Sequence, residues 1–442
     1  MQRNCGDDRV FHVGTNAKMW RVTHSAVYPT LAGQAEYKFR PGIQRVEMSE
    51  VQAPSSGRKF MPSLDGIRGY GFLLVFIAHY LSPDRLASNG STAFRVVLGL
   101  EEPAYFGIPM FFVLSGYLIG GILYESRNRE GFFRVYYSHR VLRIFPIYYL
   151  SLLIIACIDT LLRFHLNYIF WAHFFFIQNL MPGYLSQYEP LIMSHFWTLA
   201  TEEQFYLLWP LAVWFFPIRK KLCGIASLLI LLIFGIRFAA PHFISSPHVL
   251  EYWSLSRADG ILLGVLLALV CNHWIVVKIK PYAKWIALSG ILPVMLWASW
   301  RNDQWTKTFQ EAQVLIPWIN FTAVAIVIAV MEEGSWLNRV CSEKWICWFG
   351  RRSYSLYIFH FIYARMFWRF VTPYLSKWLP HVLAVLVSTA IAFCLTVLLA
   401  ILSYALIEKR TNRMRQNIRY GPLKDLPAST VSGEALRAEA ES

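Results

Sequence analysis

The first apolar segment of the chain carries two side chains that are suited to acid–base chemistry. It reads SLDGIRGYGFLLVFIAHY over residues 63–80 and contains Arg68 and His79. Their separation of eleven residues corresponds, on an α-helix, to about 16 Å of rise and about 20° off the same face. A neutral imidazole in a partly dry site can accept the proton of a hydroxyl group. The alternative is a structural histidine bonded to a neighbouring helix, and the arginine on the same stripe weakens that alternative.

Two arginines precede the third apolar segment, in the sequence SHRVLRIFPIYY at residues 138–149. We expect this stretch to be a cytoplasmic loop that leads into the third span. Arg140 and Arg143 are one helical turn apart, so both guanidinium groups project from one side at the membrane surface. Two adjacent planar forks suit phosphate oxygens. A basic loop that only anchors the topology explains the same spacing equally well.

A pair of carboxylates opens the fourth apolar segment, which reads SHFWTLATEEQFYLLWP over residues 194–210. Consecutive residues on a helix point about 100° apart, so at most one of Glu202 and Glu203 easily faces a shared site. A carboxylate inside a span is costly unless it faces protein or water, and each one is therefore a functional-site hypothesis. We assign a buried role to Glu203. The alternative is that the glutamate only lies in water at the membrane interface.

Three further polar residues within apolar segments are candidates for a supporting role. Arg257 and Asp259 are two residues apart and do not face each other, so each needs a partner on another helix. His360 lies inside a later span, where we expect a structural hydrogen bond. Small residues four positions apart are typical of helix-packing seams, and two such pairs are Gly116 with Gly120 and Gly260 with Gly264.

The composition of the whole chain indicates a membrane protein. Of its 442 residues, 56% are hydrophobic and 16% are charged, whereas a soluble domain averages about 45–50% apolar and about 25% charged residues. The net charge of +15 does not indicate nucleic-acid binding, because the basic residues fall in short clusters between apolar runs. The seven cysteines show no metal-ligand spacing, and we expect no metal site.

Apolar runs long enough to cross a hydrocarbon core of about 30 Å follow one another from residue 63 onward. They predict an all-α integral membrane protein with about ten transmembrane helices. The run from Tyr168 to Ile177 is too short to span and is expected to lie at the interface or to re-enter. The predicted spans are residues 63–82, 105–124, 144–163, 196–217, 222–240, 257–276, 284–300, 315–331, 353–371 and 381–406.

The basic residues divide unevenly between two alternating sets of loops. One set holds about 20 lysines and arginines and the other about 5. Because cytoplasmic loops carry the excess of positive charge, the richer set and both chain termini are predicted to be cytoplasmic. The expected location is the inner (plasma) membrane of a cell, which the chain crosses many times.

The chain divides into three parts. Residues 1–60 are polar, lack a signal-peptide core, and are interpreted as a disordered extension. A start at Met48 is equally compatible with the sequence and would leave residues 1–47 untranslated. Residues 61–408 form the membrane domain, and residues 409–442 form a polar cytoplasmic tail.

The apolar segments and their polar residues resemble acyltransferase family 3, the membrane O-acyltransferases that modify O-antigen, peptidoglycan, exopolysaccharide, Nod factor and macrolides. The resemblance runs from about residue 60 to residue 408. A single matching string is weak evidence, whereas six in order on a ten-helix layout are strong. The six strings are LDGIRGYGFLLVFIAH, MFFVLSGYLIGG, RVLRIFPIYY, HFWTLATEEQFYLLWP, RADGILLGVLLA and RSYSLYIFHF.

The resemblance implies a set of site residues and substrates. The donor is expected to be acyl-CoA, and acetyl-CoA is the donor we favour. No permanently bound cofactor is expected. The acceptor is expected to be a hydroxyl of a glycan or lipid-linked molecule. The imidazole would remove the hydroxyl proton, the arginines would hold the CoA phosphates, and the glutamate would orient or polarise the site. The positions that match the family's site motifs are Arg68, His79, Ser115, Gly116, Arg140, Arg143 and Glu203.

Two further expectations concern a partner domain and a rival function. Many family members carry a hydrolase-like partner domain, and the roughly 35 residues after the last span are too few for one. We therefore expect a separate protein on the outer face to supply that role, if it is supplied at all. The rival interpretation is a transporter that uses the same buried charges, although no inverted repeat of the transporter kind is visible.

Overall fold

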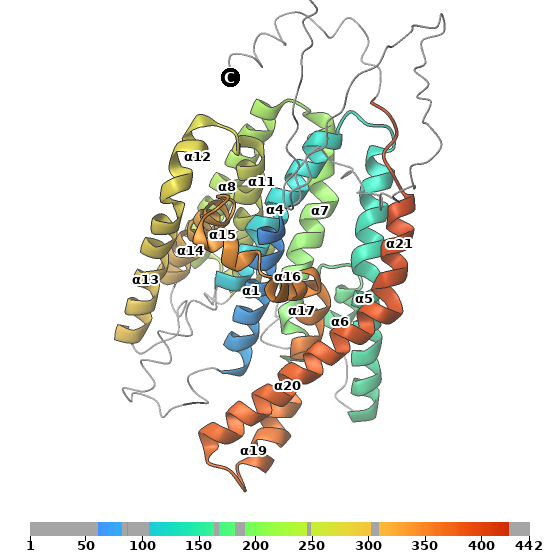
Figure 1. The fold of residues 1–442 in the computed structure, drawn as a ribbon, viewed down its shortest axis with the longest axis vertical. Helices are drawn as coiled ribbons and strands as arrows, with labels where there is room; N and C mark the ends of the chain where they lie inside the picture. Colours follow the sequence, from blue (N-terminus) through green and yellow to red (C-terminus); the bar gives the residue numbers. More distant parts are fainter. Residues whose placement is uncertain are drawn as a thin grey trace, which may run out of the picture. The chain divides into compact units, whose positions relative to one another are not determined.

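The computed structural model describes residues 61–81, 86, 106–162, 168–181, 191–244, 249–301 and 309–423. The expectations for residues 1–60 and for a start at Met48 lie outside this part, as do residues 424–442 of the tail. The described residues form helices joined by turns, with one isolated β-bridge, between Arg129 and Leu423. The all-α class expected from the apolar runs therefore holds for the described part of the chain (Figure 1).

Twelve α-helices in the described part of the chain have eight residues or more, and the other α-helices there have six or fewer. The longer helices are α1 (Pro62–Tyr80), α4 (Gly107–Ser126), α5 (Phe132–Leu162), α7 (Trp197–Phe215), α8 (Arg219–Ala239), α11 (Asp259–Val270), α13 (Ala283–Arg301), α14 (Phe309–Val330), α16 (Lys344–Arg351), α17 (Ser353–Ile362), α20 (His381–Ser403) and α21 (Lys409–Asn417). The shorter ones are α6 (Tyr168–His173), α9 (Val249–Tyr252), α10 (Ser254–Arg257), α12 (Trp274–Ile279), α15 (Trp336–Cys341), α18 (Ala364–Met366) and α19 (Thr372–Leu375).

Within the described residues, five helices are long and apolar enough to cross a membrane, and a sixth span is reached if one bent pair counts. The five are Gly107–Ser126, Phe132–Ile158, Arg219–His242, Gln313–Val330 and His381–Asn417. The bent pair joins Asp259–Val270 to Trp274–Trp297 at 102°. The protein is thus a membrane protein by its helices, whereas the count of about ten stays a prediction. Breaks explain part of the difference, because the predicted span 353–371 is divided among α17, α18 and a π-helical segment.

Large apolar side chains on the outer faces of the spans point away from the protein. Leu231 on α8 is 65% exposed, and on α13 Leu296 is 69% and Trp300 77% exposed. Soluble monomers rarely expose large contiguous apolar surfaces, because contact between apolar side chains and water is unfavourable. A bilayer removes this cost, since its acyl chains are as apolar as the side chains that meet them.

The backbones of α4 and α11 approach each other closely at two glycines. A Cβ atom added at Gly116 would lie 1.8 Å from the carbonyl oxygen of Ile261, and one at Gly264 would lie 2.0 Å from that of Val113. Only glycine fits where two helix backbones touch in this way. The small-residue seams expected from the sequence therefore join α4 to α11, and this fixes the position of Ser115, the residue before Gly116.

The expected loop at residues 138–149 is helical, and this prediction was wrong. Helix α5 begins at Phe132 and continues through Pro146 to Leu162. Polar and basic residues dominate its first turns, and their composition hid a helix whose apolar part starts later. Arg140 and Arg143 consequently project from the side of a rigid helix.

Candidate active site

A cavity of about 80 Å³ opens among α1, α4, α5, α7 and α17. A water molecule needs about 10–15 Å³ of such volume, so the cavity accommodates several waters or the end of a small substrate. Its wall is apolar on the side of Phe111, Phe112 and Ile144. The ionisable side chains that line it are Arg68, Arg140, Arg143, Glu202 and Glu203, joined by the hydroxyl groups of Ser115, Thr198, Tyr206, Ser353, Tyr354 and Tyr357.

Both glutamates line the cavity, so the expectation that only one easily faces a shared site was wrong. The α7 residues on the wall form two adjacent rows, one with Thr198, Glu202 and Tyr206 and the other with Leu199 and Glu203. Rows at positions i, i+4 and i+8 and at i+1 and i+5 are neighbours on a helix. The cavity therefore covers a stripe of α7 wide enough for two consecutive side chains.

Glu202 accepts the hydrogen bonds that hold the polar side of the cavity together. Ser115 Oγ donates to Glu202 Oε1 at 2.8 Å, and the Tyr206 hydroxyl donates to Glu202 Oε2 at 3.3 Å. Tyr206 also lies 3.1 Å from Ser115 Oγ. The three side chains form a closed triangle that joins α4 to α7. The sequence offered one signal for it, the one-turn spacing of Glu202 and Tyr206, but none for Ser115 as their partner.

Three arginines give the cavity its positive charge. Arg68 pairs with Asp65 one turn away on α1, with 3.5 Å between Nη1 and Oδ1. The Arg140 guanidinium lies 5.0 Å from the centre of the Tyr206 ring, a cation–π contact. Arg143 is within electrostatic range of both Arg68 and Arg140. These three arginines outnumber the two glutamates in the cavity wall, and an excess of positive charge favours an anionic ligand.

His79 does not line this cavity but sits beside a second histidine. Its Nδ1 lies 2.8 Å from the carbonyl oxygen of Val75, and because a carbonyl only accepts, Nδ1 carries the proton. His360 Nδ1 likewise donates to the carbonyl of Tyr357 at 2.6 Å. The remaining nitrogen of His360, Nε2, then accepts from His79 Nδ1 at 3.3 Å. In its neutral form His79 therefore has its basic lone pair on Nε2.

A third imidazole continues this cluster towards the cavity. The rings of His195 and His360 are 5.2 Å apart, and the hydroxyl of Tyr357 donates to the carbonyl of His195 at 3.0 Å. Tyr357 also lines the cavity, so one side chain separates the cavity from the imidazoles. In the described part of the chain, no three His, Cys, Asp or Glu side chains are arranged to hold a metal ion. His195 was not singled out from the sequence.

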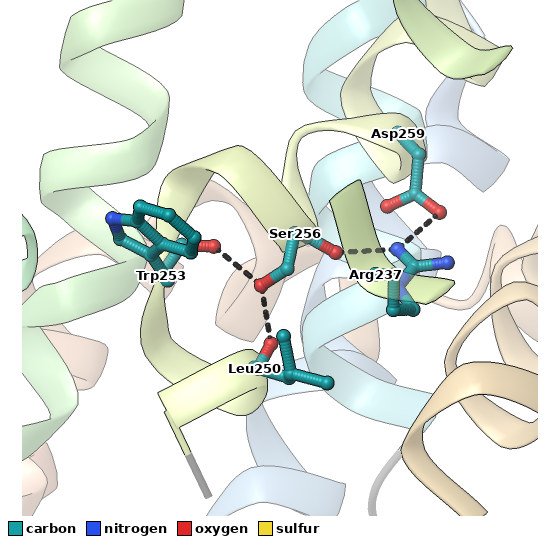
Figure 2. A network of polar contacts seen from close by, with 5 residues as sticks. All are labelled: Arg237, Leu250, Trp253, Ser256 and Asp259. Atoms are coloured by element: carbon teal, nitrogen blue, oxygen red, sulfur yellow. Dashed lines mark hydrogen bonds and ion pairs between the residues drawn. The ribbon is translucent and has the colours of Figure 1, made fainter. Parts of the chain in front are cut away.

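The two charged residues near residue 258 have partners on other helices, as expected, and stand apart from the cavity. Asp259 is paired with Arg237 of α8, with 2.9 Å between Oδ2 and Nη2, and both side chains are completely buried. Arg237 also donates to the carbonyl of Ser256, which ties α8 to α10 (Figure 2). Arg257 lies 5.5 Å from the centre of the Trp197 ring on α7. Their positions indicate a structural role.

Gly116, the second member of the Ser-Gly pair, does not reach the cavity. Ser115 lines it, whereas Gly116 is packed against the backbone of α11. The structure thus brings Arg68, Ser115, Arg140, Arg143 and Glu203 together and places Gly116 behind them.

Comparison with known proteins identifies a family and individual proteins to which the chain is similar. A sequence model described as an acyltransferase domain, of acyltransferase family 3, matches residues 61–405. A Staphylococcus aureus protein named "Putative O-acetyltransferase SAS0844" is 25% identical over 332 residues, which are 69% of this chain and 50% of that protein. The peptidoglycan O-acetyltransferase OatA of Listeria monocytogenes is 24% identical over 375 residues, which are 79% of this chain and 56% of that protein.

The chain therefore spans about half the length of the curated relatives it matches. Comparison with solved structures gave no match. The family model covers most of the chain, including every side chain that lines the cavity. On this evidence the chain belongs to acyltransferase family 3.

Proposed function

We propose that this protein is a membrane O-acyltransferase that transfers an acyl group from acyl-CoA to a hydroxyl of a carbohydrate or lipid-linked acceptor. Acetyl is the acyl group that we favour. The observation that carries the proposal is a small cavity lined by three arginines and two glutamates in a chain of this family. The two relatives named above as O-acetyltransferases support the choice of acetyl and of oxygen as the accepting atom.

The arginines set the side from which the donor enters. Acyl-CoA is a polyanion that does not cross a bilayer unaided, so its phosphates must meet cations on the cytoplasmic side. We place Arg140 and Arg143 at that side, in an inner membrane that about ten helices cross with both termini cytoplasmic. The uneven distribution of basic loop residues supports this orientation.

The transfer itself requires the acceptor hydroxyl to lose a proton as its oxygen attacks the thioester carbonyl. We assign this proton to His79 Nε2, since Nδ1 is committed to the carbonyl of Val75. Because His79 does not line the cavity, the thioester carbonyl must pass Tyr357 to meet the acceptor hydroxyl beside the imidazole. The C–S bond then breaks, and the CoA thiolate takes up the proton that His79 had accepted, which returns the imidazole to its neutral form. Proton transfer by a positioned base contributes about 10²–10⁴-fold. Glu203 and the triangle of Ser115, Glu202 and Tyr206 orient the acyl end within the cavity.

The test is turnover by the purified full-length chain in lipid nanodiscs. Release of CoA from acetyl-CoA is followed by a thiol reagent, and acetyl-ester formation on glycan and lipid-linked sugar acceptors by mass spectrometry. His79→Ala should reduce turnover at least about hundredfold, and Glu203→Gln should also impair it. Glu343→Gln changes an exposed carboxylate outside the cavity and is the matched control.

A wild-type protein that binds acetyl-CoA without acylating any acceptor would contradict the proposal. Movement of a solute across sealed vesicles by such a protein would then support a transporter. Membership of the acyltransferase family does not favour that alternative.

A further inference from the structure

We infer that Arg415, from a segment beyond the residues that match the family, is a further binding residue for the polyphosphate of the donor. This inference rests on the proposed function, because it takes acyl-CoA as the donor. The family match ends at residue 405, whereas Arg415 lies on α21, the helix that follows. Residues 409–423, here called the C-terminal strap, return along α5 and place Arg415 near the cavity arginines (Figure 1).

The C-terminal strap is fixed to the start of α5 by backbone and side-chain hydrogen bonds. His139 Nε2 lies 3.1 Å from the carbonyl oxygen of Arg415 and 2.8 Å from that of Ile418. Farther along, the backbone N–H of Glu130 donates to the carbonyl of Pro422 at 3.1 Å, and Gly421 donates back to Glu130 at 3.1 Å. His139 precedes Arg140 directly, so the contact that holds the strap also sets Arg415 against the paired arginines.

Arg415 has a charge environment that favours an anion. It is within electrostatic range of Arg140 and Arg143, and no carboxylate in the described part of the chain lies within ion-pair distance of it. Its Nη1 donates to Asn412 Oδ1 at 3.0 Å, which orients the guanidinium. The Nε atoms of Arg415 and Arg140 are both buried and lack a hydrogen-bond partner among the described residues.

The size of the cavity indicates which part of the donor Arg415 meets. A cavity of about 80 Å³ holds the acyl end of the donor but not its nucleotide. The phosphates must therefore lie outside the cavity, on the side of the arginines. Arg415 does not line the cavity, and it lies within electrostatic range of two arginines that do. Its planar fork suits phosphate oxygens there.

The experiment compares two donors in the full-length protein in nanodiscs. Acetyl-CoA carries the phosphates, whereas S-acetyl-pantetheine ends before them. Arg415→Ala should raise the KM and the Kd for acetyl-CoA about tenfold, because a charge-assisted contact is lost. It should leave both constants for S-acetyl-pantetheine unchanged and lower kcat little. Arg415→Lys keeps the positive charge but lacks the planar guanidinium group, so its KM and Kd for acetyl-CoA should lie between those of the wild type and of Arg415→Ala.

Arg413→Ala is the matched control, since Arg413 is an exposed arginine on the same helix. If wild-type protein uses acetyl-CoA and Arg415→Ala behaves like Arg413→Ala, this inference is wrong and the proposed function stands. An equal loss with both donors would also overturn it, because the effect would then not depend on phosphate. A wild-type protein that neither binds nor uses acetyl-CoA would refute the proposed function and this inference together.

Discussion

Replacing His360 with phenylalanine tests how the proposed base is held. The substitution keeps a ring of similar size in a site packed against Phe72 and Phe361. It removes Nε2, which accepts from His79 Nδ1. His360 then can no longer help to keep the proton of His79 on Nδ1.

The expected decrease in kcat follows from the two hydrogen bonds that the proton on His79 Nδ1 donates. The carbonyl of Val75 lies at 2.8 Å and remains in place, whereas His360 Nε2 lies at 3.3 Å and is lost. A neutral hydrogen bond contributes about 0.5–1.5 kcal/mol, and a long one lies at the lower end. His360→Phe should therefore lower kcat about twofold to threefold. His79→Ala, which removes the base itself, should lower it at least about hundredfold.

The assay is steady-state acetyl transfer in nanodiscs over a range of pH, with thermal unfolding as a check on folding. The pH profile of His360→Phe should keep its shape, because Val75 still selects the same tautomer of His79. A loss as large as that of His79→Ala in a stably folded His360→Phe variant would refute this reasoning, since His360 would then be a proton carrier in its own right. Unchanged kcat would show that Val75 alone positions His79.

Three further predictions concern donor binding, stability and orientation. Arg143→Lys should raise the KM for acetyl-CoA about threefold to tenfold with little change in kcat, because the planar fork is lost; an unchanged KM in initial-rate assays would leave the arginine as an anchor only. Asp259→Leu should destabilise the protein by about 3–5 kcal/mol, because it leaves Arg237 buried without its partner. Adding Arg237→Met to the same chain should recover most of the lost stability. Equal thermal unfolding of the single and double variants would contradict this prediction. In a cysteine-free background, Lys377→Cys should react with an impermeant thiol reagent on intact cells and Arg413→Cys only after lysis; the reverse labelling would invert the proposed orientation.

The positions of single ionisable residues in apolar runs could be predicted from the sequence, but their contacts could not. Arg140 and Arg143 share a cavity with Arg68, which is far from them along the chain. Helix geometry favoured Glu203 alone because a single line along a helix admits one of two consecutive residues, whereas the cavity covers two rows of α7. The hydrogen bond between His79 and His360 joins residues 281 positions apart, and no local pattern encodes such a contact.

Helix boundaries and breaks were the part of the fold that the sequence predicted least well. Hydropathy identifies the apolar part of a helix but not a polar extension such as the start of α5. It also places breaks inexactly, since the predicted span 257–276 runs past the 102° bend that follows Val270. Asp259 was expected to need a partner on another helix, yet Arg237 could be identified as that partner only in three dimensions.

The glycine contact between α4 and α11 has a consequence for the interpretation of mutational screens. Any side chain at Gly116 must push the two backbones apart, since its Cβ would lie 1.8 Å from the Ile261 oxygen. Ser115 moves with that backbone, and this changes its geometry relative to Glu202, to which it is bonded across the cavity. A screen that scores only activity will consequently rank Gly116 among the active-site residues, although it touches no part of the cavity. Measuring the amount of folded protein beside its activity will not fully separate the two effects, because a displaced helix can remain folded while the serine it carries is misplaced.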